Sequence, residues 1–394
     1  MRHRSRGRSW LALAALAALA GCARPPASPA PAAAPPPVSW NVPPGPGPAL
    51  TAVSFAQLPG WQADHLAAAL PAFLAGCDAM ARGAALGGFA EAAQRGGAAR
   101  DWQAVCAAAH AVPPGDEAAA RHFFETAFQP YGISADGSAA GLFTGYYEPE
   151  VAGARQPGGI YRYPIYRRPP GLPAGPGHRP YFTRAQIDAG ALRGRHLELF
   201  WLADPIDAFF LHIQGAARIR LPDGQVVRVS YDGQNGRTYV PIGRVLVDRG
   251  QMTLDQVSMQ SIRAWLVAHP SEAQGLMEQN PSYVFFRELR GVPADEGPPS
   301  ALGAPLSPRR SLAVDKSFVP LGAPVWVDTT DPTGAPLRRL AVAQDLGGAI
   351  RGPVRADIFF GWGPAAEEAA GRMHQQGHDF VLLPRRPGDA LAAR

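Results

Sequence analysis

The sequence predicts an α+β fold that is mainly β, with N-terminal helices followed by two β-rich segments. Residues 50–130 are rich in Ala and Leu at helical spacing, as in the run Trp61–Phe73. From Leu142 to Val247 the pattern changes to short runs with period-two alternation and frequent Gly and Pro turns, which is typical of a small barrel. Strand-like runs dominate again from Leu312 onward, so the expected order is helices, barrel, barrel.

The first 21 residues have the pattern of an export signal. Four arginines precede an apolar run from Trp10 to Ala20, and this run is too short to cross a bilayer as a mature helix. The following Gly21-Cys22 resembles a bacterial lipobox, which predicts that Cys22 is lipidated and becomes the mature N-terminus. Since Ala23, not Asp, follows the Cys, the usual lipoprotein rule implies a lipid anchor at the periplasmic face of the outer membrane.

Residues 22–49 are predicted to be a tether. Proline recurs throughout this segment among Ala, Gly and Ser, a composition that favours extended polyproline II structure at about 3.1 Å per residue. The charge balance points away from nucleic acid. Of the formal net charge of +5, four units come from arginines in residues 1–21, and no run of basic residues with interleaved aromatics follows.

Helical elements are expected in the N-terminal part and again before and after the second β-rich segment. Cys77 and Cys106 lie on two of these helices, where they either form a disulfide in an oxidising compartment or remain two buried thiols. The sequence leaves both options open. The expected helices are 66–82, 100–111, one starting at Asp116, 253–268, 271–278 and 364–376, and the clearest hairpin is 217–229, turning on residues 222–225.

Three aspartates follow or interrupt apolar runs in the C-terminal segment. Asp345 and Asp357 stand on either side of a glycine-rich turn, and Asp315 ends a third strand-like run. An Asp beside Gly at a strand end is usually a turn former. Burial, however, raises the pKa of a carboxyl group toward the range of a general acid, so the set of three suggests an acid-base site.

The run 341–360 resembles the three-aspartate (3D) domain of the membrane-bound lytic murein transglycosylase A family. The resemblance extends over roughly residues 50–385, because further family motifs occur in the same order at 143–149, 212–215, 231–237 and 280–286. It implies that the helices and the C-terminal segment share one domain around a double-psi β-barrel, with a second β-barrel domain inserted and a groove between the two. The implied divisions are 1–21 (signal), 22–49 (tether), 50–147 (helical part of domain A), 148–290 (inserted domain B), 291–385 (3D part of domain A) and 386–394 (tail).

The resemblance implies cleavage of the β-1,4 bond between N-acetylmuramic acid and N-acetylglucosamine in peptidoglycan, leaving 1,6-anhydromuramoyl ends. One carboxyl group suffices for this reaction, because the muramoyl C6 hydroxyl replaces water as the nucleophile. By motif position the catalytic residue is Asp357, and its apolar neighbours Ala356 and Ile358 agree with a desolvated acid. Asp345 is expected to be an ionised, orienting neighbour, and Asp315 to have a structural hydrogen-bonding role.

Polar and aromatic side chains of the other motifs are candidates for holding the glycan, by stacking and hydrogen bonds. For Tyr147 the alternative is core packing, and for the Asp-Gly and Asn-Gly pairs it is simple turn formation. The candidates are Thr144, Tyr146, Tyr147, Gln214, Asp232, Gln234 and Asn235.

Metal and cofactor chemistry is not expected. His374 and His378 have the zincin spacing but lack the Glu general base, so they are interpreted as a polar helix end, and Gly361–Ala366 as a strand-to-helix turn. The expected partners are peptidoglycan strands and, through the lipid, the membrane, with cell-wall synthesis or division proteins as further partners. Two alternatives stay open: a peptidoglycan hydrolase using the Asp345–Asp357 pair, and a wall-binding lipoprotein without activity.

Overall fold

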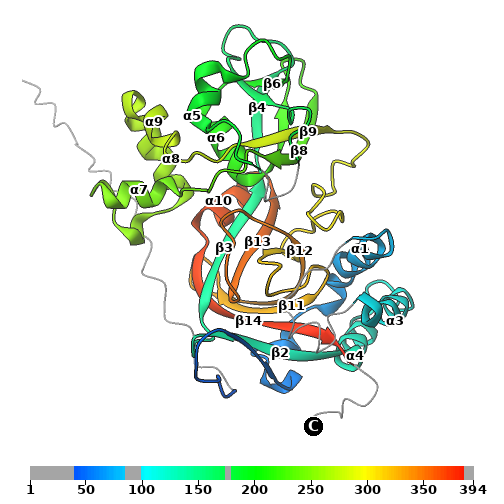
Figure 1. Cartoon of the computed structure of the whole chain (residues 1–394). Helices are drawn as coiled ribbons and strands as arrows, with labels where there is room; N and C mark the ends of the chain where they lie inside the picture. Colours follow the sequence, from blue (N-terminus) through cyan, green and yellow to red (C-terminus); the bar gives the residue numbers. More distant parts are fainter. Residues whose placement is uncertain (1–39, 85–98, 174–178, 386–394) are drawn as a thin grey trace, which may run out of the picture.

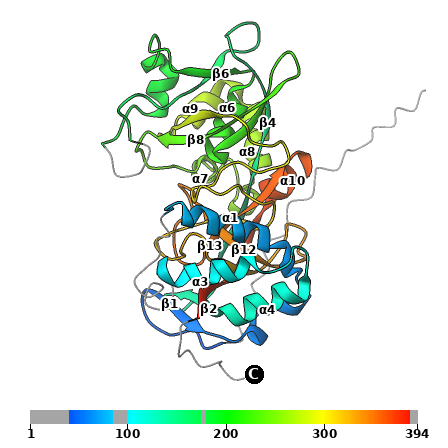
Figure 2. The same cartoon turned by 90° about the vertical axis from the view of Figure 1, so that its right-hand side faces the viewer.

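The computed structural model describes residues 40–84, 99–173 and 179–385. The chain forms two lobes (Figures 1 and 2): one is built around a barrel that includes the C-terminal strands, the other around a second sheet formed by the middle of the sequence. The chain passes between the lobes where β3 leads into β4 and again after β9. The predicted signal peptide, Cys22 and the 386–394 tail lie outside the described residues.

The barrel lobe contains an eight-stranded sheet in the order β1-β2-β14-β11-β12-β10-β13-β3. An additional pairing of β14 with β3 closes the strands from β14 to β3 into a ring, and β10–β12 and β13–β3 are its parallel pairs. The double-psi assignment and the groove stay predictions. The strands are β1 (Pro48–Ala52), β2 (Phe128–Ala135), β3 (Gly141–Glu148), β10 (Ser311–Val314), β11 (Pro324–Thr330), β12 (Pro336–Asp345), β13 (Arg355–Trp362) and β14 (His374–Pro384).

Sequence patterns missed β1 and β2, which join the barrel sheet although they lie in the parts of the chain interpreted as tether and helices. The predicted tether is wrong at its end, because Trp40 is buried with its ring 4.8 Å from that of Phe380 and β1 begins at Pro48. The barrel core is apolar on both faces, as the fully buried Trp326 on β11 illustrates. Strands buried on both faces show no alternation, which is why the pattern was hard to interpret.

The N-terminal helices cover one side of the barrel (Figure 1). Asp116 caps α4 by accepting a hydrogen bond from the Ala119 N–H at 2.9 Å, as its place before an Ala-rich run predicted. The elements are the 3-10 turns η1 (Phe55–Gln57), η2 (Trp61–Ala63) and η3 (Leu66–Ala68), and the helices α1 (Leu70–Ala81), α3 (Ala99–His110) and α4 (Glu117–Ala127).

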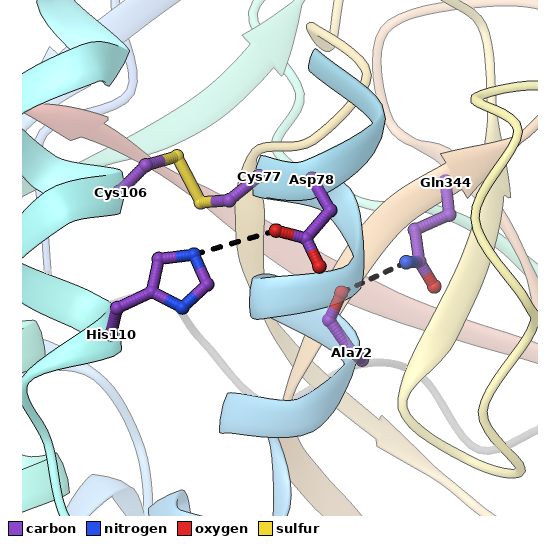
Figure 3. Close-up of a disulfide and its surroundings, with 6 residues drawn as sticks. All are labelled: Ala72, Cys77, Asp78, Cys106, His110 and Gln344. Atoms are coloured by element: carbon purple, nitrogen blue, oxygen red, sulfur yellow. Dashed lines mark hydrogen bonds and ion pairs between the residues drawn. A yellow bond between two sulfur atoms is a disulfide. The ribbon is translucent and has the colours of Figure 1, made fainter. Parts of the chain in front are cut away.

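A disulfide joins α1 to α3. Cys77 and Cys106 are bonded with their Cα atoms 5.5 Å apart, and the His110 imidazole lies 3.4 Å from the Asp78 carboxylate beside them (Figure 3). The alternative of two free thiols is therefore wrong. Gln344 on β12 donates a hydrogen bond to the Ala72 carbonyl at 2.9 Å, which ties α1 to the strand that carries Asp345.

The second lobe contains a six-stranded sheet in the order β5-β6-β4-β7-β8-β9. The predicted hairpin is present, since β7 and β8 pair antiparallel from Ala216↔Ser230 to Arg220↔Val226. No ladder joins the edge strands β5 and β9 within the described residues, so closure into a barrel stays a prediction. The strands are β4 (Glu150–Ala154), β5 (Tyr163–Tyr166), β6 (Glu198–Leu202), β7 (Ala216–Arg220), β8 (Val226–Gln234) and β9 (Val284–Leu289).

The remaining helices lie in the second lobe and at the junction of the lobes. The expected helix 364–376 is too long, because α10 ends at Arg372 and His374 already belongs to β14; the two histidines therefore lie on a strand, not at a helix end. No helix among the described residues is long and apolar enough to cross a membrane. The elements are α5 (Arg184–Gln186), the π-helical turn η5 (Ile187–Ala191), α6 (Pro205–Gln214), α7 (Ile242–Asp248), η6 (Leu254–Gln256), α8 (Met259–Ala268), α9 (Pro270–Met277) and α10 (Pro364–Arg372).

A buried ion cluster joins the lobes at the end of β3. The Glu148 side chain is fully buried and lies 2.8 Å from Arg228 Nε and 3.0 Å from Arg218 Nε. The Arg218 guanidinium also lies over the Trp362 ring, 4.3 Å from its centroid. Because β3 belongs to the barrel and both arginines belong to the second sheet, this cluster fixes the first crossing between the lobes.

Candidate active site

The strand register brings Asp345 and Asp357 to the same face of the barrel. On β10, Ala313 pairs with Asp345 of β12 on one side and with Asp357 of β13 on the other. Asp357 in turn pairs with Thr144 of β3, and Thr144 with His374 of β14. Since paired residues point to the same face of a sheet, five strands place these side chains in one row.

The Thr-Gly-Tyr sequence of β3 suits this position. Thr144 and Tyr146 lie two residues apart and share the face of the acids, as the alternation of a strand requires. Gly145 faces the other side, against α10, where a Cβ atom would lie 2.7 Å from Ala370 Cα and 2.7 Å from the Phe360 ring. A side chain at 145 would push α10 away from the strand, so glycine permits the close packing that holds β3.

Asp357 is partly exposed, and its carboxyl group has polar neighbours. Its Oδ1 accepts a hydrogen bond of 2.8 Å from the Thr144 hydroxyl. Burial raises the pKa of Asp357 to about 6, against the lowering effects of the nearby Arg355 and of the Thr144 bond, and the charge of Asp345 adds to the rise. A carboxyl group with a pKa of about 6 is able to hold a proton near neutral pH and to release it in a reaction.

Asp345 has more hydrogen-bond donors than its neighbour. The Ala301 N–H donates to its Oδ1 at 2.9 Å and the Tyr146 hydroxyl to its Oδ2 at 3.0 Å. Burial raises the pKa of Asp345, while these bonds and one from the Leu346 N–H act in the opposite direction, because they favour the ionised form. The arrangement suits a group that keeps its charge and orients its surroundings.

Tyr146 and Tyr147 point to opposite sides of β3. Tyr146 is nearly buried, with its ring packed against Phe359 and its pKa raised well above the usual range by burial and by both aspartates. It therefore holds Asp345 and is not an exposed stacking surface. Tyr147 belongs to the barrel core, where its hydroxyl bonds Glu367, so packing is the better interpretation of this residue.

The candidates from the second lobe have structural partners. Gln214 at the end of α6 accepts a hydrogen bond of 3.0 Å from the Tyr147 N–H, and Asp232 lies 3.4 Å from Arg168. Asn235 is fully buried; its amide donates to the carbonyls of Phe182 and Pro281, and its oxygen accepts from the Tyr283 N–H. Direct contact of Asn235 with a glycan is therefore a prediction that the structure contradicts. Gln234 lies beside it at the end of β8.

Asp315 has the structural role that its position suggested. It is 7% exposed, and its two oxygens accept hydrogen bonds of 3.0 Å from the N–H groups of Ser317 and Gly352. It therefore ties the end of β10 to the loop before β13.

Sequence reasoning missed three groups around the acids. Arg355 lies two residues before Asp357 and donates to the Thr144 hydroxyl at 2.9 Å. The i, i+2 spacing on one strand would have indicated that Arg355 shares the face of Asp357, but not its contact with Thr144. The Ala301 N–H carries no sequence signal, since any residue there would supply it. Tyr239 comes from the second lobe. Burial raises its pKa to about 12, and the charge of Asp357 adds to the rise; a tyrosine in a loop gave no sign of this proximity.

One cavity lies away from the acids. A cavity of about 200 Å³ is lined by Tyr147, Glu150, Arg263 and Glu367 among others, at the junction of the lobes. Within the described ranges, no group of three or more His, Cys, Asp or Glu side chains is arranged to hold a metal ion.

Two family patterns match consecutive parts of the chain. The family pattern of the MltA specific insert domain matches residues 142–287, and that of the 3D domain matches residues 310–383. Membrane-bound lytic murein transglycosylase A of Escherichia coli K12 is 38% identical over 276 residues, which are 68% of this chain and 72% of the relative. The chain belongs to the membrane-bound lytic murein transglycosylase A family. The Vibrio cholerae member is 34% identical over 249 residues, 61% of this chain and 65% of its own length, slightly less than two thirds.

Solved structures of lytic murein transglycosylases share the fold. The enzyme of Agrobacterium tumefaciens superposes with a TM-score of 0.76 at 37% identity, covering 86% of this chain and 98% of that one. A monoclinic form of the Neisseria gonorrhoeae protein gives 0.70 at 35% identity, covering 91% and 99%. The Escherichia coli protein with bound chitohexaose gives 0.59 at 34% identity, covering 73% and 83%. As a member of this family, the protein is a peptidoglycan lytic transglycosylase.

Proposed function

We propose that the protein cleaves the β-1,4 bond between N-acetylmuramic acid and N-acetylglucosamine and leaves 1,6-anhydromuramoyl ends, with Asp357 as the single acid and base. The observation that carries the proposal is the row of side chains around Asp357. The pKa of Asp357 is raised to about 6, and its carboxyl group accepts a hydrogen bond from Thr144. Ala313 of β10 pairs with both Asp357 and Asp345, so the two acids lie on strands that flank β10.

In the first step, the protonated carboxyl group of Asp357 gives its proton to the glycosidic oxygen while the bond from that oxygen to the muramoyl C1 breaks. Positive charge develops at C1 and the ring oxygen. The ionised Asp345, held by Tyr146 and the Ala301 N–H, supports this charge electrostatically.

In the second step, the muramoyl C6 hydroxyl attacks C1, and Asp357, now ionised, takes the proton of that hydroxyl. The carboxyl group returns to its starting state, and no water is consumed. An internal nucleophile has a high effective concentration, so a second carboxylate is not needed to activate water.

The barrel face that carries the two acids also indicates where the substrate binds. The chitohexaose bound by the Escherichia coli relative is a chain of β-linked N-acetylglucosamine, which has the backbone chemistry of a peptidoglycan strand. We infer that such a strand lies along the face formed by β10, β13 and β3, in a groove between the lobes. Tyr239 would contact it from the second lobe, since it lies within electrostatic range of Asp357.

The site of action is the periplasmic face of the outer membrane, reached through lipid on Cys22. Curated relatives are named membrane-bound, and no described helix could cross a bilayer. Replacing Cys22 with Ser and fractionating cells tests the anchor: the variant should leave the membrane fraction, and persistence there would contradict it.

The decisive experiment digests purified sacculi and analyses the soluble products by mass spectrometry. The wild-type protein should release anhydromuropeptides. Asp357→Asn keeps the shape of the side chain and removes the proton, so it should lower product release by about a thousandfold or more. Asp315→Asn serves as the control at a structural aspartate and should retain activity in the folded fraction.

Two outcomes would overturn the proposal. Reducing-end products from the wild-type protein would show a hydrolase that uses the Asp345–Asp357 pair. Anhydro products released at a normal rate by folded Asp357→Asn would show that another group donates the proton.

A further inference from the structure

Arg355 is held rigidly beside the catalytic acid by three hydrogen bonds. Its Nη1 donates to the carbonyl of Ala356 at 2.7 Å and to that of Leu142 at 3.2 Å, and its Nη2 donates to the Thr144 hydroxyl at 2.9 Å. The guanidinium therefore bridges β13 and β3 at the level of Asp357. Only a planar fork of donors can make this set of contacts, which a lysine could not reproduce.

The Thr144 hydroxyl stands between the arginine and the acid. It accepts from Arg355 Nη2 and donates to Asp357 Oδ1 at 2.8 Å. A hydroxyl has one proton to give, and a neighbouring cation turns that proton away from itself. The proton of Thr144 is thereby directed at Oδ1 of Asp357.

We propose that Arg355 is a positioning residue that acts through Thr144 to keep the acidic proton of Asp357 on Oδ2. Oδ1, which accepts from Thr144, is then the carbonyl oxygen of the neutral acid. Oδ2 makes no hydrogen bond within the described residues and is the oxygen that gives the proton to the leaving group. The proposal deepens the proposed function and depends on Asp357 being the acid.

The same arrangement serves both steps of the reaction. When Oδ2 gives its proton to the glycosidic oxygen, the negative charge that appears on Asp357 is stabilised by the Thr144 hydroxyl and by the charge of Arg355. When the C6 hydroxyl attacks, its proton returns to Oδ2. The arginine and the threonine gain and lose no proton, so the balance of the cycle is unchanged.

Four variants separate this role from simple packing. Arg355→Met removes the charge and the donors, Arg355→Lys keeps the charge but not the fork, Thr144→Val removes the hydroxyl, and Thr144→Ser restores it. Arg372→Met is the matched control, because Arg372 is an exposed arginine in an ion pair with Glu368 at the end of α10. For each variant, kcat, KM and the pH dependence of kcat are measured on soluble peptidoglycan fragments, together with the melting temperature.

The expected result is a loss of about tenfold to a hundredfold in kcat for Arg355→Met and Thr144→Val, with KM little changed, since the lost interactions act in the transition state. The pH at which kcat declines should move upward in both, because Arg355 and the Thr144 bond lower the pKa of Asp357. Arg355→Lys should recover little activity, Thr144→Ser most of it, and Arg372→Met should match the wild type.

Other outcomes would overturn the inference. If Arg355→Met only lowers the melting temperature while the folded protein keeps the wild-type kcat and pH profile, Arg355 is structural. If Thr144→Ser and Thr144→Val behave alike, the hydroxyl does not position the proton. These results are distinguishable from failure of the proposed function, which would appear as activity of Asp357→Asn or as reducing-end products.

Discussion

Asp357 and Asp379 lie in the same barrel, and burial raises the pKa of both, to about 6 and about 8 respectively, yet their surroundings differ completely. Asp357 is partly exposed and bonded by Thr144, with Arg355 nearby. Asp379 is 1% exposed, pairs with Val327 of the core, and neither of its oxygens bonds another described residue. A raised pKa alone therefore does not identify a catalytic acid. Solvent exposure of the carboxyl group and its hydrogen-bond partners distinguish the two.

Glu148 differs from Asp379 in its charged partners. It is fully buried like Asp379, but two guanidinium groups contact it. The three acids thus differ in what compensates their charge: two contacting guanidinium groups for Glu148, a hydroxyl donor with a guanidinium nearby for Asp357, and no hydrogen bond from another described residue for Asp379. Compensation by cations suits a structural tie, and a hydroxyl donor suits a group whose proton must move.

The largest expected effect is a loss of stability when Glu148 is replaced. Glu148→Gln leaves two buried guanidinium groups without their carboxylate, which should lower the free energy of unfolding by about 3–5 kcal/mol. Glu150→Gln, which breaks the exposed pair with Arg220 nearby, should cost about 0.2–1 kcal/mol and is the matched control. Urea unfolding measures both. Similar losses for the two variants would mean that the buried cluster is no stronger than a surface pair.

The next effect is the pH dependence of the reaction. A general acid works in its protonated form, so with a pKa of about 6 for Asp357 the rate should be highest below pH 6 and fall about tenfold per pH unit above it. Initial rates of product release from pH 5 to pH 8.5 test this. Asp379→Asn should show the same profile, since Asp379 lies away from the reacting atoms. A rate that stays constant to pH 8 would contradict the assignment of Asp357.

Much of this comparison was accessible from the sequence. Asp345 and Asp357 stood out because apolar runs and a glycine turn surround them, and Thr144 and Tyr146 because a hydroxyl and a ring alternate along a strand. The sequence did not indicate that Asp379 is buried, since an acid at the start of a strand-like run normally faces solvent. Its burial follows from the pairing of β14 with β11, which places Asp379 opposite Val327 of the core, a pairing between distant segments that no local pattern encodes.

The roles of other residues depended on long-range contacts in the same way. Asn235 was expected to bind a glycan but holds together loops more than 45 residues away in sequence. Arg355 was not among the candidates from the sequence, because only the parallel pairing of β13 with β3 brings it to Thr144.

The third prediction uses Asp379 itself. Its pKa is raised in the folded protein, so the folded state binds a proton that the unfolded state has lost, and the stability of the wild-type protein should decrease as pH rises from about 4 to about 8. Asp379→Asn cannot ionise and should be less dependent on pH, with an advantage of about 1–3 kcal/mol at pH 8 that disappears near pH 4. Melting temperatures across this range measure it. A constant difference at all pH values would indicate a change in packing instead.

The smallest expected effect tests whether hydrogen-bond donors distinguish the active-site acids. Tyr146→Ala is too large a change for this test, because the ring is 9% exposed and packs on Phe359, so its loss would cost stability as well as activity.

Tyr146→Phe is the sharper change, because it keeps the ring and removes only the donor to Asp345, which retains the Ala301 N–H. Losing one hydrogen bond to a charged group should reduce kcat about tenfold, corresponding to about 1.4 kcal/mol, with a small change in melting temperature. Tyr147→Phe, which loses a bond to Glu367 on the opposite side of β3, should leave kcat unchanged. If both phenylalanine variants lower kcat equally, the effect comes from the position of β3, and the donors around Asp345 do not account for the difference from Asp379.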